Sequence, residues 1–364
     1  MSVRIFYPQK DSTIYFYSGS FSNSLINTGN DAILEVNKPI NSNYTRALLQ
    51  FNTTDISTYL DDNSLHLNNT QSLANLRVFT AEAEEIPADI SLDIYPVSQS
   101  WDNGIGKANF SPIETGSVNW YYKTDGVLWN TLSSGGGTYV TSSTSYASFS
   151  LDESTDIESN ITDILVEWIS GSVDNNGLII KRNSTDEATS YGRGNLKYFS
   201  KNTNTIFRPR IEVYGNDKEY SFTTASDFQH YTGSKQTIIK SSNLKGVYYY
   251  DNTTRINFFL RETHPTVGYV TSFDDVDEYQ SLYKMFTSSS YRIKDLASNE
   301  TIIDFNYNYT AVNNDEDGSY INLNMNNFEV DRYYSIAFKY LDQDNNTTFY
   351  SDDRNLTFKV VKTY

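Results

Sequence analysis

Short runs of β-branched and aromatic residues, separated by Asn, Asp, Gly and Ser, recur along most of the chain. Apolar and polar residues alternate within many of these runs, which puts one face of each strand in a core and the other in solvent. Packed antiparallel sheets are the economical way to cover so many one-sided strands. The pattern therefore predicts an all-β fold built from sandwiches. Clear examples are 47–51, 76–79, 91–95, 177–181, 210–214, 254–260, 334–340 and 356–361.

One segment, 155–168, has helical spacing instead of alternation. Thr155 and Glu158 form a capping-box pattern at its start, and Gly171 supplies a stop. We expect this short helix to pack on a sheet, with Trp168 as its core anchor. The apolar face of the expected helix consists of Ile157, Ile161, Ile164, Leu165 and Trp168.

A change in composition after Tyr214 divides the chain. A clear strand pattern ends at that residue, and small polar residues follow at 215–221. The length of 364 residues also favours about two domains. We predict an N-terminal domain over 1–215 and a second one, a linker followed by a sandwich, over 216–364. Irregular loops are expected at 101–129 and 133–148, and the acidic segment 273–279 is expected to be a loop or short helix.

Composition excludes several classes of function. A net charge of −17 argues against a nucleic-acid-binding protein, because phosphate backbones are met by clustered Lys and Arg. The chain has no Cys and three widely spaced His, and it contains neither a nucleophile elbow, a zinc-protease helix nor a phosphate-binding glycine loop. We therefore expect a protein that is not an enzyme. No run approaches the roughly 18 apolar residues of a membrane span, and the first residues do not resemble a signal peptide.

One segment partly matches a calcium-binding loop. Asn313, Asp315 and Asp317, followed by Gly318, fit the first half of an EF-hand, whose positions 1, 3 and 5 carry oxygen ligands. Position 12 is Asn324 instead of the bidentate Glu, and the flanking residues look like strands. A solvated hairpin turn is the better interpretation, and no metal site is predicted there.

The order of elements over 1–215 carries a family resemblance. An Asp-containing opening strand at 10–15 leads to the turn Asn27-Thr-Gly29 and then to strands at 33–36 and 45–51. An isolated Trp101, the element Val118-Asn-Trp120, the segment 163–181 and the closing strand 208–213 follow in order. This stretch resembles the jelly-roll domains called DNRLRE, which are related to carbohydrate-binding modules. Such jelly rolls sometimes hold a structural Ca²⁺ near the first strand, so the resemblance makes Asp11 and Asp31 conceivable oxygen ligands; no other cofactor is implied.

The remaining residues are similar to an immunoglobulin-like sandwich, as found in virion proteins of tailed bacteriophages. The turn and strand series from Asp315 to Phe338, the absence of Cys, the acidic charge and the Tyr- and Asn-rich strands are also similar to such proteins. The resemblance implies a structural virion protein of the neck, tail or baseplate. Such a protein would be made in the host cytoplasm and would act by assembly with other virion proteins.

Aromatic residues in the loop-rich segment are the candidate binding residues: Trp101, Trp120, Tyr121, Tyr122 and Trp129. Exposed aromatic rings stack on sugars, which makes a carbohydrate-binding surface module the alternative function. The same residue types are enriched in protein interfaces and also serve as core plugs. The sequence leaves these interpretations open.

Overall fold

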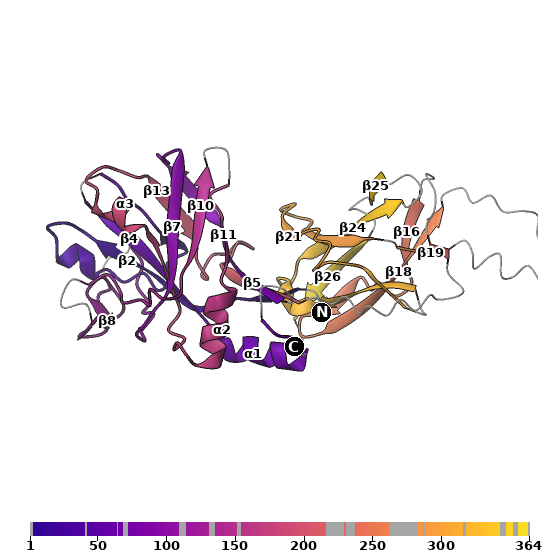
Figure 1. The fold of residues 1–364 in the computed structure, drawn as a ribbon, viewed down its shortest axis with the longest axis horizontal. Coiled ribbons are helices and arrows are strands. Elements are labelled where there is room, and N and C mark those ends of the chain that lie inside the picture. Colours follow the sequence, from indigo (N-terminus) through magenta and orange to yellow (C-terminus); the bar gives the residue numbers. More distant parts are fainter. Residues whose placement is uncertain are drawn as a thin grey trace, which may run out of the picture. The chain divides into compact units, whose positions relative to one another are not determined.

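The computed structural model describes residues 3–40, 42–63, 65–67, 72–108, 114–130, 135–150, 154–215, 229–230, 237–262, 283–286, 288–315, 318–342, 347–351 and 356–362. The chain divides into two compact units, of which one is Ile5–Val213 and the other combines Met1–Arg4 with Tyr214–Tyr364 (Figure 1). The expected segments 216–221 and 273–279 lie outside the described residues. Each unit is described below by itself.

The N-terminal unit is built around a five-stranded antiparallel sheet. Its strands, in spatial order, are β10 (Ser145–Ser150), β7 (Asp89–Pro96), β12 (Leu178–Arg182), β4 (Tyr44–Phe51) and β2 (Pro8–Phe16). A four-stranded sheet consists of β1 (Val3–Phe6), β14 (Arg210–Gly215), β5 (Ser72–Val78) and β11 (Ile157–Asn160). Smaller sheets are formed by β3 (Ile33–Glu35), β13 (Asn195–Phe199) and β6 (Thr80–Glu84), and by β8 (Tyr122–Thr124) and β9 (Val127–Leu128).

The burial of the strands locates the core. In β7, Ile90, Leu92 and Ile94 are buried while the residues between them are half-buried, as the sequence alternation predicts. All five residues of β12 are buried, and β4 is likewise closed on both faces over most of its length. These two central strands therefore contribute to the sandwich interior on one face and lie under covering residues on the other. The predicted all-β fold is confirmed.

Three short helices complete the described part of the N-terminal unit. They are α1 (Thr53–Asp62), α2 (Thr162–Ser170) and α3 (Ser184–Ala188), in addition to a 3₁₀ turn at Ser22–Leu25. The Asn52 side chain caps α1 by accepting a 3.0 Å hydrogen bond from the Thr54 backbone N–H. Helices α1 and α2 contact each other at one end of the sheets, and α2 also contacts β5 (Figure 1).

The expected helix over 155–168 is wrong in its first half. Residues 157–160 form strand β11, which pairs with β5 in antiparallel register, and Ile157 and Ser159 are buried while Glu158 and Asn160 are exposed. Helix α2 begins at Thr162 and ends at Ser170, and Gly171 caps it in the left-handed conformation with φ of 75°. The alternation of buried and exposed residues over 157–160 therefore overrides the capping-box pattern. Trp168 is buried, as expected. The expected loop 133–148 is also shorter, because β10 begins at Ser145 and pairs with β7.

The C-terminal unit contains two mostly antiparallel sheets. One consists of β15 (Gln229–His230), β19 (Tyr283–Met285), β18 (Thr253–Glu262), β23 (Gly318–Asn324) and β22 (Asn313–Asp315), with β16 (Thr237–Ser241) beside β18. The other consists of β17 (Val247–Tyr249), β26 (Thr357–Val361), β24 (Tyr333–Asp342), β20 (Ser290–Asp295) and β21 (Thr301–Ile303), with β25 (Thr347–Tyr350) beside β24. A 3₁₀ turn, Met325–Asn327, follows β23.

Aromatic rings join the two sheets of this unit. The Phe338 ring of β24 lies 4.7 Å from the Phe258 ring of β18 and 4.9 Å from the Phe286 ring, measured between centroids. All three residues are buried, so the core sits between the sheets. Within the described part of the chain, no helix has the length and apolar character needed to cross a membrane.

Candidate functional site

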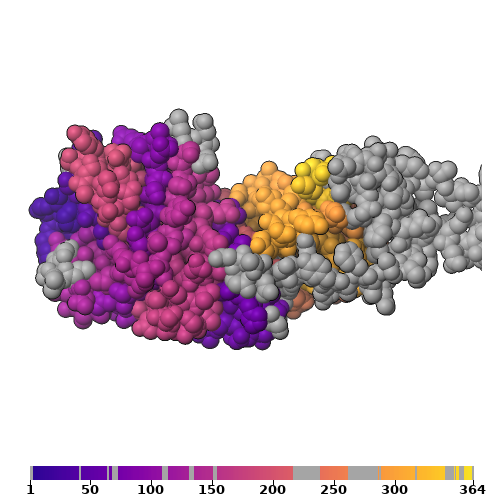
Figure 2. Space-filling view, in the orientation of Figure 1, coloured from indigo at the N-terminus to yellow at the C-terminus, as the bar shows by residue number. Residues whose placement is uncertain are grey.

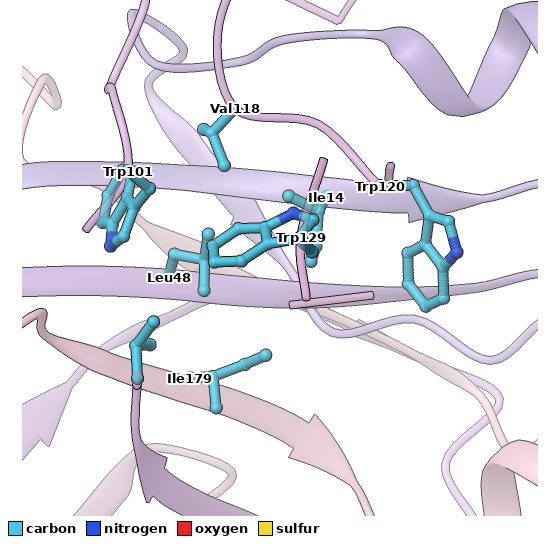
Figure 3. Packing of buried hydrophobic residues seen from close by; sticks show 8 residues of the cluster. Ile14, Leu48, Trp101, Val118, Trp120, Trp129 and Ile179 are labelled. Atoms are coloured by element: carbon cyan, nitrogen blue, oxygen red, sulfur yellow. The ribbon is translucent and has the colours of Figure 1, made fainter. Parts of the chain in front are cut away.

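A cluster of aromatic residues covers one face of the five-stranded sheet. Trp129 lies between Trp101 and Trp120 and packs against Ile14 and Leu48 (Figure 3). The sheet side of the cluster comes from β2, β4 and β12, and the covering side comes from the loops after β7. The complete cluster consists of Ile14, Leu48, Val97, Trp101, Val118, Trp120, Trp129 and Ile179.

The three tryptophans are core residues, not exposed stacking platforms. Their exposed fractions are 1% for Trp101 and 2% for both Trp120 and Trp129. The indole N–H of Trp101 donates to the Asn176 carbonyl at 2.8 Å, and that of Trp129 donates to the Asn119 carbonyl at 3.0 Å. A sugar has no access to these rings while the loops are in place. Of the sequence-predicted binding residues, only Tyr121 and Tyr122 keep part of their surface in solvent.

The loop around Gly136 closes on Trp120. Gly136 has φ of 87°, and a Cβ added there would lie 2.7 Å from Arg46 Nη1 and 2.8 Å from Trp120 Cζ2. A side chain at this position would therefore clash with both residues, besides adopting an unfavourable backbone conformation. The glycine allows the loop to approach the sheet face and to pack against the Trp120 indole.

Exposed apolar side chains surround the half-exposed tyrosines. The Phe21 ring lies 4.7 Å from the Tyr121 ring, and 55% of Phe21 is exposed. On the neighbouring hairpin, Leu128 pairs with Tyr122, and Val127 and Leu128 are both almost half exposed. We call Phe21, Tyr121, Tyr122, Val127 and Leu128 the hydrophobic rim. Sequence reasoning missed Phe21, Val127 and Leu128, although the apolar pair after Asp125-Gly126 in a predicted loop was a usable signal.

Buried charges lie beside the tryptophan cluster on the same sheet. Arg46 donates from Nε and Nη2 to the two carboxylate oxygens of Glu187, at 2.9 and 2.8 Å, and from Nη1 to the Gly136 carbonyl. Lys181 Nζ lies 3.2 Å from Glu187 Oε2. Glu187 therefore neutralises part of the charge of two buried cations. Arg46 therefore binds both a carboxylate and a loop carbonyl.

Protonation equilibria are perturbed in this charged group. Burial lowers the pKa of Lys181, in opposition to the attraction of Glu187, and Arg46 lowers it further. Burial raises the pKa of the Asp93 carboxyl on β7, against the opposing effect of Lys181. Both shifts favour the neutral forms of these two side chains.

Asp11 on β2 and Asp31 just before β3 both accept hydrogen bonds from backbone N–H groups. Asp11 Oδ2 accepts a 2.5 Å hydrogen bond from the Lys201 backbone N–H, while the buried Oδ1 accepts from no described residue. The oxygens of Asp31 accept from the backbone N–H groups of Ile33 and Ala108, at 3.4 and 3.0 Å. Burial raises the pKa of Asp11 to about 7.

The donor set around the two aspartates does not fit a Ca²⁺ site. Calcium takes six to eight oxygen ligands, commonly from several ionised carboxylates. In the part of the chain that the structure describes, no group of three or more acidic, His or Cys residues is arranged to hold a metal ion. Three of the four aspartate oxygens accept backbone hydrogen bonds, so they already have partners within the protein.

The EF-hand-like segment is a hairpin, as its strand-like flanks indicate. Asn313–Asp315 pairs with Gly318–Tyr320 in antiparallel register, so Asp315 lies opposite Gly318. Arg255 Nη2 donates to the Asp315 carboxylate at 2.5 Å. The hairpin interpretation is confirmed, and Asp315 has a structural ion pair.

Neither a protein-family model nor a curated protein matches the chain. The inferences that follow therefore rest on the sequence and on the geometry above.

Proposed function

We propose that this chain is a non-enzymatic structural protein of a tailed-bacteriophage virion, a component of the neck, tail or baseplate. It acts by assembly with other virion proteins. The resemblance of the sequence to phage virion proteins suggests the setting. The observation that carries the assembly role is the hydrophobic rim, which stands on loops held to the sheet by buried tryptophans.

Two physical properties make the rim suitable for assembly. Exposed aromatic and aliphatic side chains gain free energy when a partner removes them from water, and Tyr and Phe are enriched in interface cores. The rim is also preorganised, because Trp129 directly follows Leu128 and its backbone N–H donates to the Tyr121 carbonyl at 3.0 Å. Little loop ordering is then needed on binding, which reduces the entropic cost of association.

Incorporation into particles tests the proposal. We would produce the chain with the other structural proteins of its particle and measure its copy number in purified virions. A fixed stoichiometry for the native chain, and loss of incorporation for the double variant Val127→Ser and Leu128→Ser, support assembly through the rim. Tyr191→Ser is the matched control, since Tyr191 is 78% exposed and lies outside the rim. Absence of the native chain from purified particles would refute the proposal.

Carbohydrate binding is the second candidate, favoured by a different part of the same sheet. Tyr146 on β10 is 68% exposed, and the half-buried rings of Tyr95 and Tyr139 stack with centroids 4.8 Å apart. Rings exposed in this way present apolar faces to a sugar. Glycan-array binding by the isolated chain that is lost in Tyr146→Ala, and retained in the rim variant, would favour this function over assembly.

A further inference from the structure

A lysine and an aspartate face each other on two central strands of the five-stranded sheet. Lys181 on β12 and Asp93 on β7 are direct partners in the antiparallel register. Cβ atoms of directly opposed residues are about 4.5–5.5 Å apart, which the four-carbon stem of a lysine spans easily. The Lys181 side chain is only 3% exposed, so its amine is largely shielded from water.

A third residue supplies a proton carrier. Glu187, from α3, places Oε2 at 3.2 Å from Lys181 Nζ and is itself held by both Nε and Nη2 of Arg46. Lys181 Nζ also donates to the Arg182 carbonyl at 2.6 Å. The amine is thus held next to a carboxylate that can take up its proton, on the strand residue that pairs directly with Asp93.

The same surroundings favour the reactive protonation states. Burial lowers the pKa of Lys181, which increases the fraction of neutral, nucleophilic amine. Burial raises the pKa of Asp93, which increases the fraction of neutral carboxylic acid, a better electrophile than a carboxylate. Tyr95 and Asp186 are the other titratable groups that influence Asp93 besides Lys181 and Glu187.

We propose that Lys181 and Asp93 are the site of an intramolecular amide cross-link between β12 and β7, formed with Glu187 as the proton carrier. The neutral Nζ attacks Cγ of the protonated Asp93, and a C–N bond forms. Glu187 accepts a proton from the nitrogen and returns it to the departing hydroxyl group. The C–O bond then breaks and one water leaves, so the reaction needs no oxidant, reductant or other reactant.

Such a bond would tie together distant parts of the chain. Residues 93 and 181 are adjacent in the sheet but far apart in sequence. A covalent link between them restricts the unfolded chain strongly, in the same way as a disulfide that closes a long loop. Unlike a disulfide, the amide does not respond to reducing agents, and it suits a chain without Cys.

Intact-mass spectrometry of the full chain, with peptide mapping, tests the proposal. We expect a mass below that of the sequence by one water, about 18 Da, and a protease-resistant branched peptide that joins Lys181 to Asp93. The Lys181→Arg variant lacks the attacking amine, so it should have the full mass calculated from its own sequence. Asp93→Asn should still react but expel ammonia, about 17 Da, because the amide nitrogen then leaves in place of the hydroxyl.

Two further variants separate this reaction from other mass losses. Glu187→Gln should leave most of the chain uncross-linked, because it removes the proton carrier while keeping both reacting groups. Lys197→Arg is the matched control, since Lys197 faces Glu82 on a neighbouring strand pair but is exposed, and it should not change the mass loss. A native chain of full sequence mass, or a loss of water without the branched peptide, would overturn the proposal.

Discussion

The guanidinium carbon of Arg46 lies 4.9 Å from the centroid of the Trp120 ring. The same guanidinium binds Glu187 through two nitrogens and the Gly136 carbonyl through the third. One side chain on β4 therefore connects the loop that covers the sheet, the helix α3 and the aromatic cluster. This relationship explains how long irregular segments are held in a defined position.

Replacing Arg46 by Lys should show the value of this geometry. The charge remains, but the paired bonds to Glu187 and the planar stacking on Trp120 are lost. We expect the free energy of unfolding to fall by about 2 kcal/mol. Chemical denaturation checks this value, with Arg77→Lys, a more exposed arginine of the same unit, as the comparison. Equal effects of the two substitutions would contradict the special role of Arg46.

Trp129→Ala should be strongly destabilising, because the side chain is 2% exposed and fills the centre of the cluster on the sheet. Removal of so large a buried ring costs about 3–5 kcal/mol. Leu128→Ala, at the adjacent and almost half-exposed position, should change stability by about 0.5 kcal/mol or less. Thermal and chemical denaturation of both variants would measure the difference. A mild effect of Trp129→Ala would mean that the loops do not close on the sheet.

Trp168→Ala should also cost about 3–5 kcal/mol, because its ring docks α2 into the core. Trp168→Phe provides a sharper test. The indole Nε1 of Trp168 is buried and donates to no described residue, so the substitution removes no hydrogen bond within the described part of the chain. We expect the Phe variant to lose less than about 1.5 kcal/mol. If the Ala and Phe variants lost similar amounts of free energy of unfolding, the indole N–H would contribute a hydrogen bond to stability, and this prediction would be wrong.

The stability of the chain should depend on pH through Asp11. Its pKa is about 7 in the folded state and 3.8 in a reference peptide, so between these values the folded chain binds more protons than the unfolded one. The Asp11 contribution is therefore fully favourable below about pH 4, decreases as the pH rises towards 7 and is constant above that value.

Asp11→Asn isolates this contribution from those of other carboxyl groups. The amide keeps an acceptor for the Lys201 N–H but cannot ionise. Relative to the native chain, the variant should gain stability from about pH 4 to pH 7, by at most about 4 kcal/mol. Urea denaturation at pH 4.5, 6 and 8 measures the difference. A pH-independent difference between the two chains would show that Asp11 ionises normally.

Local patterns in the sequence determined the strands and several turns. Alternation along 91–95 and the apolar runs at 47–51 and 177–181 were sufficient to locate β7, β4 and β12, because burial of a strand face leaves a period of two. The turn at Asn27 was also predictable, and its Oδ1 accepts from the Gly29 N–H at 3.2 Å. The end of α2 was predictable as well, because Gly171 readily takes the left-handed conformation that ends a helix.

The start of α2 was not determined locally. Ile157 and Ile161 fit both a helix face and, with Ser159, an alternating strand. Strand β5 was needed as a partner before 157–160 could become β11. Tertiary pairing therefore decided between two local structures of similar propensity.

The candidate sites depended almost wholly on tertiary structure. A tryptophan in a loop has the same sequence signature whether its ring is exposed or buried, and only closure of the loops on β2, β4 and β12 made Trp101, Trp120 and Trp129 core residues. Arg46 and Glu187 come from distant parts of the chain, on β4 and α3 (Figure 1), and the surface of the N-terminal unit in Figure 2 likewise brings together segments coloured from indigo to pink. The sequence by itself determined which segments become strands, because a strand pattern is periodic and local. Only the fold decided which side chains meet, because contacts between distant residues depend on how the strands pair.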